Sequence, residues 1–259
     1  MGLAGLALLA APAAAQDAGL RGTSDPSASG RAVAVTVHGA GGPAVVVRAP
    51  GRAPVRFDGA SWPALDGPRL AYVDGDGVRV VDWRTGTEIV RLDGPAAKPA
   101  LDWPRLAYVR LAPAGRRLDL IHLPTGRRRV VTGVGPGTDL GRPTLAGGLI
   151  AYHVAAGRRS EIRLTSVARL GRGRLVASAV SGLQISPSIA YGRILWVEQS
   201  GSTSYLRLRR LGGGAVRTLA SVRGARRILW TSALGARVAY ATRWAAAQGR
   251  GRVISRRWR

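Results

Sequence analysis

The sequence predicts an all-β protein, a β-propeller of six four-stranded antiparallel blades. Three observations predict this fold. One ten-residue phrase recurs five times, short apolar runs alternate with Gly, Pro and Asp clusters, and no stretch has the 3.6-residue periodicity of an amphipathic helix. The repeats run almost to the end of the 259-residue chain. We therefore predict a single propeller domain over residues 31–259.

The recurring phrase sets the spacing of the blades. Its copies align without a gap at residues 63–72 (PALDGPRLAY), 99–108 (PALDWPRLAY), 143–152 (PTLAGGLIAY), 187–196 (PSIAYGRILW) and 231–240 (TSALGARVAY). The first residues of successive copies are 36, 44, 44 and 44 residues apart. A period of this size indicates one supersecondary unit that is repeated along the chain.

Each repeat predicts four short strands separated by turns. The first repeat has apolar runs at residues 62–65, 69–73, 78–82 and 88–92, with Gly-rich turns between them. Three further strands, at residues 32–37, 44–48 and 55–57, precede the first phrase without a Pro-initiated strand of their own. The last repeat stops after its third strand. With the N-terminal unit counted, the chain has six blades.

The second strand of each repeat is apolar on both faces. One column of the alignment is Leu, Leu, Ile, Ile and Val, and the next is almost entirely Ala. The column after these is aromatic: Tyr72, Tyr108, Tyr152, Trp196 and Tyr240. A strand that is apolar on both faces lies between two layers, as in stacked blades, so we expect these aromatic residues to be buried.

The N-terminal residues predict export. Residues 1–15 hold one apolar stretch, too short to span a bilayer, followed by Ala-Ala-Ala, as in a signal peptide, although no Lys or Arg precedes it. An apolar helix docked on the domain is the less favoured alternative. Residues 16–30, rich in Gly, Ser and Ala, predict a flexible lead. We expect a secreted or cell-envelope protein whose mature chain has no transmembrane segment.

The chain is strongly basic, and the charge is uneven. The net charge is +25, and all basic residues except Lys98 are Arg. Residues 1–140 carry 17 basic and 12 acidic side chains, whereas residues 141–259 carry 22 and 2. Either the second half presents a surface that binds anions, or the excess is compositional. The candidate anion-binding residues are Arg158, Arg159, Arg226 and Arg227.

The repeat resembles a known family. The phrase at residues 63–72, followed by a strand that ends in DWRTG at residues 82–86, resembles the TolB-type, WD40-like β-propeller repeat. The resemblance covers residues 31–259 and is strongest over residues 60–132. It implies a propeller fold and no particular activity. Full TolB proteins also carry an N-terminal α/β domain, which has no counterpart in this sequence.

Signals for catalysis, metals and cofactors are weak. The chain has no cysteine, so it has neither disulfides nor thiolate metal sites. His38, His122 and His153 occur singly in different repeats, so we predict no metal site. His153 replaces the Val or Ala of the other repeats, and we expect it at a strand end, reaching solvent. No catalytic residue and no cofactor is predicted.

The residues just before the phrases predict a ligand-binding rim. In a propeller the innermost strand of each blade lines the central channel. Trp62, Lys98, Arg142 and Trp230 precede their phrases and would lie near one rim, with Ser186. Two aromatic and two cationic side chains would bind a glycan or an anionic peptide. The alternative is that both Trp side chains fill the channel as part of the core.

Together these features predict an exported, monomeric, non-enzymatic scaffold that binds a protein or an anionic cell-envelope polymer. The alternative is a propeller hydrolase or lyase with its active site at the channel mouth. Clustered Asp, Glu or His at the mouth would favour the enzyme, and a basic, aromatic rim would favour binding. Nucleic acid is disfavoured, because an exported protein seldom meets it.

Overall fold

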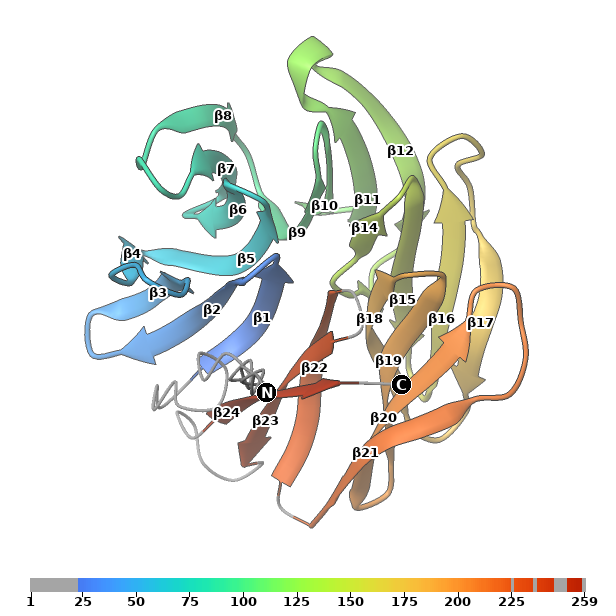
Figure 1. The fold of residues 1–259 in the computed structure, drawn as a ribbon. Helices are drawn as coiled ribbons and strands as arrows, with labels where there is room; N and C mark the ends of the chain where they lie inside the picture. The colour runs from blue at the N-terminus through green and yellow to red at the C-terminus, as the bar shows by residue number, and fades with distance from the viewer. Residues whose placement is uncertain (1–22, 225, 235–236, 245–250, 258–259) are drawn as a thin grey trace, which may run out of the picture.

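The computed structural model describes residues 23–224, 226–234, 237–244 and 251–257. These residues form six antiparallel sheets, numbered 1 to 6 in chain order, around a common centre (Figure 1). The chain passes once around the ring, so that β22–β24 at its end lie beside β1 at its start. The prediction of an all-β propeller is confirmed.

The first three sheets each contain four strands in sequence order. Sheet 1 contains β1 (Thr23–Ser29), β2 (Ala32–Gly39), β3 (Gly42–Arg48) and β4 (Val55–Asp58). Sheet 2 contains β5 (Ala60–Asp66), β6 (Arg69–Asp74), β7 (Gly77–Asp82) and β8 (Glu88–Leu92). Sheet 3 contains β9 (Ala96–Asp102), β10 (Arg105–Ala112), β11 (Gly115–His122) and β12 (Arg127–Val134), with a short 3-10 helix at Leu123–Thr125.

Sheets 4 to 6 complete the ring. Sheet 4 contains β13 (Thr138–Leu140), β14 (Thr144–Ala146), β15 (Leu149–Ala156), β16 (Arg159–Ser166) and β17 (Arg174–Ala179). Sheet 5 contains β18 (Leu183–Ala190), β19 (Arg193–Ser200), β20 (Thr203–Arg210) and β21 (Arg217–Arg223). Sheet 6 contains β22 (Arg226–Leu234), β23 (Arg237–Trp244) and β24 (Gly251–Arg257).

The prediction of six four-stranded blades is correct for five of them. Sheets 1 to 5 have four or more strands, whereas sheet 6 has three among the described residues. In sheet 4, two short strands, β13 and β14, take the place of a single inner strand, and both pair with β15. The full blades therefore number five, with a three-stranded sheet beside them.

The predicted flexible lead over residues 16–30 is wrong for residues 23–29, because these residues form β1. The predicted domain start at residue 31 therefore falls inside the β1–β2 hairpin. The sequence of β1, TSDPSAS, has the Pro of the recurring phrase but few of its apolar residues. Ser27 and Ser29 instead accept hydrogen bonds of 2.8 Å from Leu65 N and Gly67 N of sheet 2. The predicted signal peptide at residues 1–15 lies outside the described residues.

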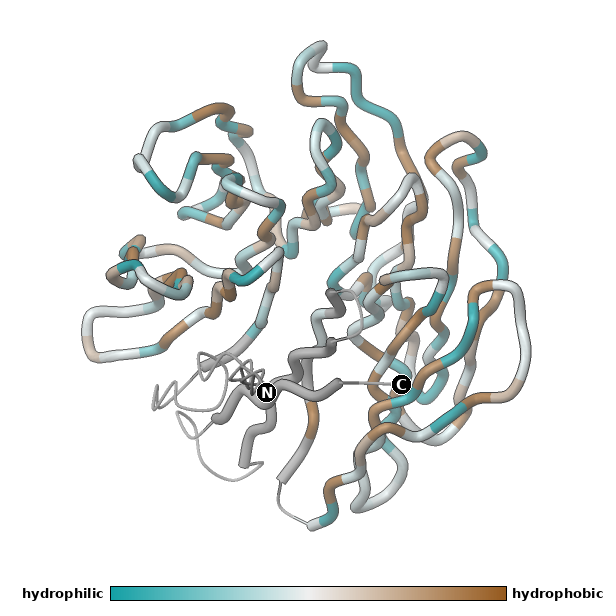
Figure 2. Tube along the Cα trace, viewed as in Figure 1, coloured by the Kyte–Doolittle hydropathy of each residue, from teal (hydrophilic) through white to brown (hydrophobic). Residues whose placement is uncertain are grey.

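The core lies between neighbouring sheets, on the second strands. Tyr72, Tyr108, Tyr152 and Trp196 are at most 5% exposed, as the aromatic column predicted, and the side chain of Tyr240 lies outside the described part. Tyr108 packs in one cluster with Val78 and Val80 of the preceding sheet. Hydrophobic residues lie mainly along the strands and hydrophilic residues mainly in the turns (Figure 2). Among the described residues no helix is long and apolar enough to cross a membrane.

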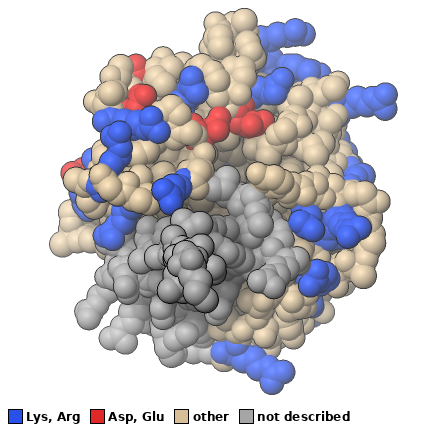
Figure 3. All heavy atoms as spheres, viewed as in Figure 1, with Lys and Arg blue, Asp and Glu red and all other residues tan. Residues whose placement is uncertain are grey.

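The two ends of the ring carry different turns. The Tyr191 end is formed by the turns between first and second strands, such as Asp102–Arg105 and Ala190–Arg193. The Lys98 end is formed by the turns between second and third strands, such as Ala156–Arg159. In the view of Figure 3, Lys and Arg side chains lie around the margin, and the few acidic ones lie in its upper part.

Candidate functional site: the central channel

The first strands of all six sheets line a cavity of about 290 Å³ in the central channel. The second residue of each copy of the recurring phrase is small, and so is its counterpart in β1, which leaves this space open. These residues are Ser27, Ala64, Ala100, Thr144, Ser188 and Ser232. Several of the hydroxyl groups join neighbouring sheets: Ala28 N donates to Ser232 Oγ (3.0 Å), which links the first sheet to the last.

Arg142 spans the channel. Its Nη1 donates to Pro26 O of β1 (3.3 Å), and its Nη2 donates to Pro63 O of β5, so a residue of sheet 4 reaches sheets 1 and 2 across the centre. Burial lowers the pKa of Arg142, and the nearby Asp25 opposes this decrease. Arg142 was predicted to lie near one rim, and its guanidinium lies inside the channel, against these two carbonyls. A guanidinium reaches this far because Arg has a long side chain with several donors in a fixed fork.

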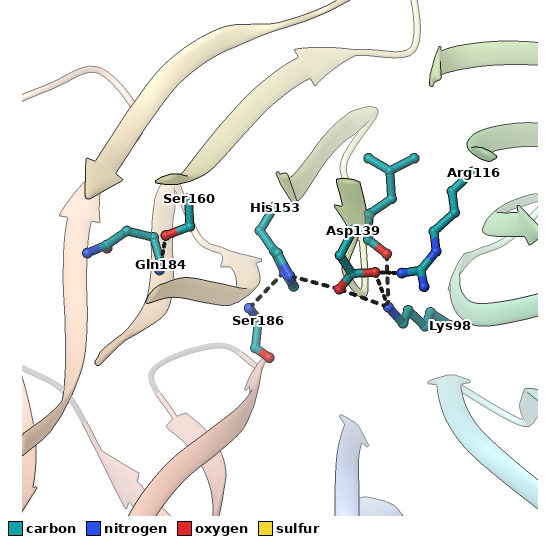
Figure 4. A network of polar contacts seen from close by, with 8 residues as sticks. Lys98, Arg116, Asp139, His153, Ser160, Gln184 and Ser186 are labelled. Atoms are coloured by element: carbon teal, nitrogen blue, oxygen red, sulfur yellow. Dashed lines mark hydrogen bonds and ion pairs between the residues drawn. The ribbon is translucent and has the colours of Figure 1, made fainter. Parts of the chain in front are cut away.

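Lys98 lies at the other end of the channel, in a network of polar contacts (Figure 4). Its Nζ is 3.1 Å from Asp139 Oδ1 and 2.9 Å from Leu140 O. Arg116 pairs with the same carboxylate. Lys98 Nζ also lies 5.9 Å from the centre of the Trp62 ring, so the structure brings together two of the predicted rim residues.

The environment of Lys98 changes its basicity. The pKa of Lys98 is lowered to about 8, mainly by burial and also by the positive charge of Arg116, while Asp25 opposes the decrease. The side chain is 17% exposed, so water reaches it only in part. Near neutral pH the amine is therefore mostly protonated, and it donates to Asp139.

His153 completes the network but is buried rather than solvent-exposed, so the expectation for it is wrong. Its Nδ1 accepts a hydrogen bond from Ser186 N (3.4 Å), and its Nε2 lies 3.7 Å from Asp139 Oδ2. Burial, together with the positive charge of Lys98, lowers the pKa of His153 to about 3, so the ring is neutral at pH 7. Gly141, opposite it, has no side chain, and the imidazole occupies that space.

The network connects side chains of several sheets. Asp139 is held by two cations, and His153 lies between Asp139 and Ser186. These residues come from sheets 3, 4 and 5, so the network joins three blades at the Lys98 end. Sequence reasoning missed Asp139 and Arg116, because neither stands in the recurring phrase. The Gly141–His153 pair was the available signal, because the same pair is Ser61–Val73, Ala97–Val109 and Ile185–Val197 in other sheets.

The channel mouth at the Tyr191 end has a different character. Two carboxylates from adjacent first strands, Asp66 and Asp102, line it. Asp66 Oδ2 accepts a hydrogen bond from Trp103 N (2.7 Å), and the guanidinium of Arg69 lies 4.1 Å from the centre of the Trp103 ring. Tyr191 stands at the same mouth and is 79% exposed. This mouth therefore offers carboxylates, hydroxyl groups and aromatic rings.

The candidate anion-binding residues lie at the Lys98 end. Arg158 is exposed in the β15–β16 turn, and Arg159 pairs with Glu161 Oε1 (2.7 Å). Arg226 and Arg227 begin β22, but their side chains lie outside the described part, as does that of Trp230. Elsewhere, arginines bond backbone carbonyls of the next sheet. These bonds are Arg129 to Val167 O, Arg174 to Leu211 O and, in the reverse direction, Arg209 to Val176 O.

Comparison with solved structures shows a β-propeller fold. A putative TolB from Agrobacterium tumefaciens superposes with a TM-score of 0.65 and 15% identity, over 92% of this chain and 91% of that one. TolB from Acinetobacter baumannii gives 0.59 and 17%, over 87% of this chain and 64% of its own. The β-propeller domain of the Trilobed protease from Pyrococcus furiosus, which has an open velcro topology, gives 0.57 and 11%, over 92% and 95%. No protein-family model and no curated protein matches the chain.

Proposed function

We propose that the protein is a non-enzymatic binding scaffold whose channel mouth at the Tyr191 end holds a partner protein. One observation carries this proposal: Arg142 spans the channel beneath a cavity of about 290 Å³ that is lined by Asp66 and Asp102 and flanked by the exposed Tyr191. Exposed aromatic residues beside polar groups are typical of binding surfaces.

The size and charge of the mouth favour a protein segment. Cavities that hold drug-sized ligands span about 300–1,000 Å³, so this one accommodates one or two side chains of a larger partner. The carboxylates Asp66 and Asp102 favour a Lys or Arg side chain of that partner. They disfavour an anionic polymer at this mouth, so a polymer would have to bind at the Lys98 end, near Arg158.

Two further points belong to the same proposal. Sheet 6 serves as a sixth blade, because its first strand, β22, lines the channel with those of the other five sheets.

Export to the cell envelope or beyond rests on residues 1–15. N-terminal sequencing of the protein from its native host tests it: a chain that begins near Gln16 supports export, and a retained Met1 on a cytoplasmic protein contradicts it.

A photo-crosslinker tests the binding surface. We replace Tyr191 with p-benzoylphenylalanine, which keeps an aromatic ring at this exposed position, and irradiate the protein in an envelope extract of its host. The matched control places the same residue at Val180, which is 76% exposed and lies at the Lys98 end. A single protein adduct at Tyr191, lost when Asp66 and Asp102 are changed to Asn, supports the proposal. Equal adducts from both positions contradict it.

A hydrolase or lyase is the second candidate, and the Lys98 network favours it. An amine with its pKa lowered to about 8, beside a carboxylate and an imidazole, has the composition of a site for proton transfer or nucleophilic attack. Esters, amides and glycosides would be tested as substrates. Activity that Lys98→Met abolishes and Arg158→Gln leaves unchanged would support the enzyme. If none of the three substrate classes is turned over, the result favours the scaffold.

A further inference from the structure

A second cavity, of about 500 Å³, lies apart from the channel, between sheets 3 and 4 at the Tyr191 end. One wall is formed by the ends of β10, β11 and β12, and the other by the segment that follows β16. We call it the Arg105 groove. Its volume lies inside the range of about 300–1,000 Å³ that is typical of small-molecule sites.

The strand register brings basic side chains together in this groove. In the strand register, Arg105 of β10 stands opposite His122 of β11, and His122 stands opposite Arg127 of β12. Arg129 stands two residues after Arg127, opposite Leu120. Residues directly opposite on antiparallel strands share a face and stand about 5 Å apart at Cβ. Three guanidinium groups and one imidazole therefore line one wall of the groove.

These charges are not neutralised within the described part of the protein. No acidic residue lines the groove, and none of the ion pairs found there involves Arg105, Arg127 or Arg129. Arg129 Nη1 donates to Val167 O (2.9 Å) of the facing segment, which fixes its guanidinium in the groove. Arg105 and Arg127 stand on either side of His122 on one face of the sheet, and a bound anion would offset the repulsion between their positive charges.

His122 adds a hydrogen-bonding imidazole to the groove. Its Nδ1 lies 2.9 Å from Thr125 Oγ1, and Thr125 Oγ1 also accepts from Arg127 N (3.4 Å). The Thr125 hydroxyl has one proton to donate. Its oxygen lies closer to His122 Nδ1 (2.9 Å) than to the backbone carbonyl oxygen of His122 (3.5 Å). When the hydroxyl donates to Nδ1, the neutral ring carries its own proton on Nε2.

The rest of the groove is apolar. Leu120, Val167 and Ala168 line it beside the arginines. Leu120 is buried and Ala168 is exposed, so apolar surface extends from the base of the groove to its edge. A hydrated inorganic anion would leave this surface uncovered, whereas an anion with an apolar body would remove it from water.

We propose that the Arg105 groove binds a small amphipathic anion, whose carboxylate or phosphate head lies among Arg105, Arg127 and Arg129 and whose apolar body lies against Leu120, Val167 and Ala168. This site goes beyond the proposed scaffold function, because it neither contacts the channel nor depends on a partner protein. A medium-chain carboxylic acid and an alkyl phosphate share the required chemistry.

Titration calorimetry with octanoate, octyl phosphate and 1-octanol tests the proposal. The wild type should bind both anions with micromolar to low-millimolar Kd, and 1-octanol at least tenfold more weakly. The tighter of the two anions identifies the head group. Arg105→Gln and Arg127→Gln should each weaken binding at least tenfold, which equals about 1.4 kcal/mol. Arg158→Gln, with the same loss of charge at the opposite end, should change Kd less than twofold.

Ala168→Asp provides a second variant that keeps all three arginines. It places a carboxylate at the exposed edge of the groove and should abolish anion binding, while photo-crosslinking through position 191 stays unchanged. Three results would overturn the proposal: no binding of either anion at millimolar concentration, equal weakening by Arg105→Gln and Arg158→Gln, or equal affinity for 1-octanol and octanoate. None of these results depends on whether the channel mouth binds a protein.

Discussion

Replacing Gly141 with alanine is the sharpest test of the packing at the Lys98 end. A Cβ at this position would lie 1.4 Å from Cε1, 1.9 Å from Nδ1 and 2.2 Å from Nε2 of His153. Contacts this short are impossible, so the imidazole must leave its site. Ser186 N then loses its acceptor. Sheets 2, 3 and 5 tolerate a side chain here because a smaller residue, Val, faces it.

The expected loss follows from these two effects. Overpacking of a buried site costs about 1–3 kcal/mol, and a buried donor left without its acceptor costs about 1–3 kcal/mol. We expect Gly141→Ala to lower the free energy of unfolding by about 3 kcal/mol. In a domain of this size that corresponds to a decrease of about 6–12 °C in Tm. Thermal denaturation followed by circular dichroism measures this shift.

The double variant Gly141→Ala/His153→Val is the matched control. It recreates the Ala97–Val109 pair of sheet 3 and so removes the overpacking, whereas Ser186 N still lacks the His153 acceptor. We therefore expect the double variant to recover about 1–3 kcal/mol of the loss and to remain less stable than the wild type. A Gly141→Ala variant as stable as the wild type would refute the reasoning. So would a double variant that is no more stable than Gly141→Ala alone.

Other predictions address stability, pH and charge. Tyr108→Ala should destabilise by about 3–5 kcal/mol in urea denaturation, and an unchanged midpoint would contradict its burial. Arg142→Met should cost about 3 kcal/mol, because it removes donors from two carbonyls in the channel; a stable variant would show that the spanning contact is dispensable. His153 has a folded-state pKa of about 3, below its unfolded value of 6.5, so stability should fall as pH decreases below 6.5, by about 2 kcal/mol at pH 5. The double variant without His153 should lack this component, and identical pH profiles would refute it. If the basic half has a binding function, salt-dependent binding of an anionic polymer should weaken when four residues are neutralised together, and unchanged binding would indicate a compositional origin of the charge. These residues are Arg158, Arg159, Arg226 and Arg227.

Much of the fold could be predicted because it is repeated. The aromatic column at Tyr72, Tyr108, Tyr152 and Trp196 recurs at one spacing, so each copy supports the burial of the others. The first strand, β1, escaped detection because its Ser residues form hydrogen bonds to the next sheet in place of apolar contacts. A polar strand of this kind has the composition of a linker, although its Pro26 and Ser27 align with the first two residues of the phrase at 187–196.

The candidate site was less predictable, because it depends on contacts across the ring. Arg142 bonds to backbone carbonyls of β1 and β5, and backbone atoms leave no signal in the sequence. The position of Lys98 in the first strand did predict that it lies near Trp62. The Arg105 groove depends on the register of β10, β11 and β12, which becomes known only when the strands are paired.

Hydrogen exchange of the protein alone and with the partner identified by crosslinking tests the central claim, that the Tyr191 end is the binding surface. Amides in the turns between first and second strands, at Gly67, Trp103, Tyr191 and Gly192, should exchange more slowly in the complex. Amides in the turns of the Lys98 end, at residues 75–76 and 157–158, should exchange at unchanged rates. Protection confined to the Lys98 end would contradict the account.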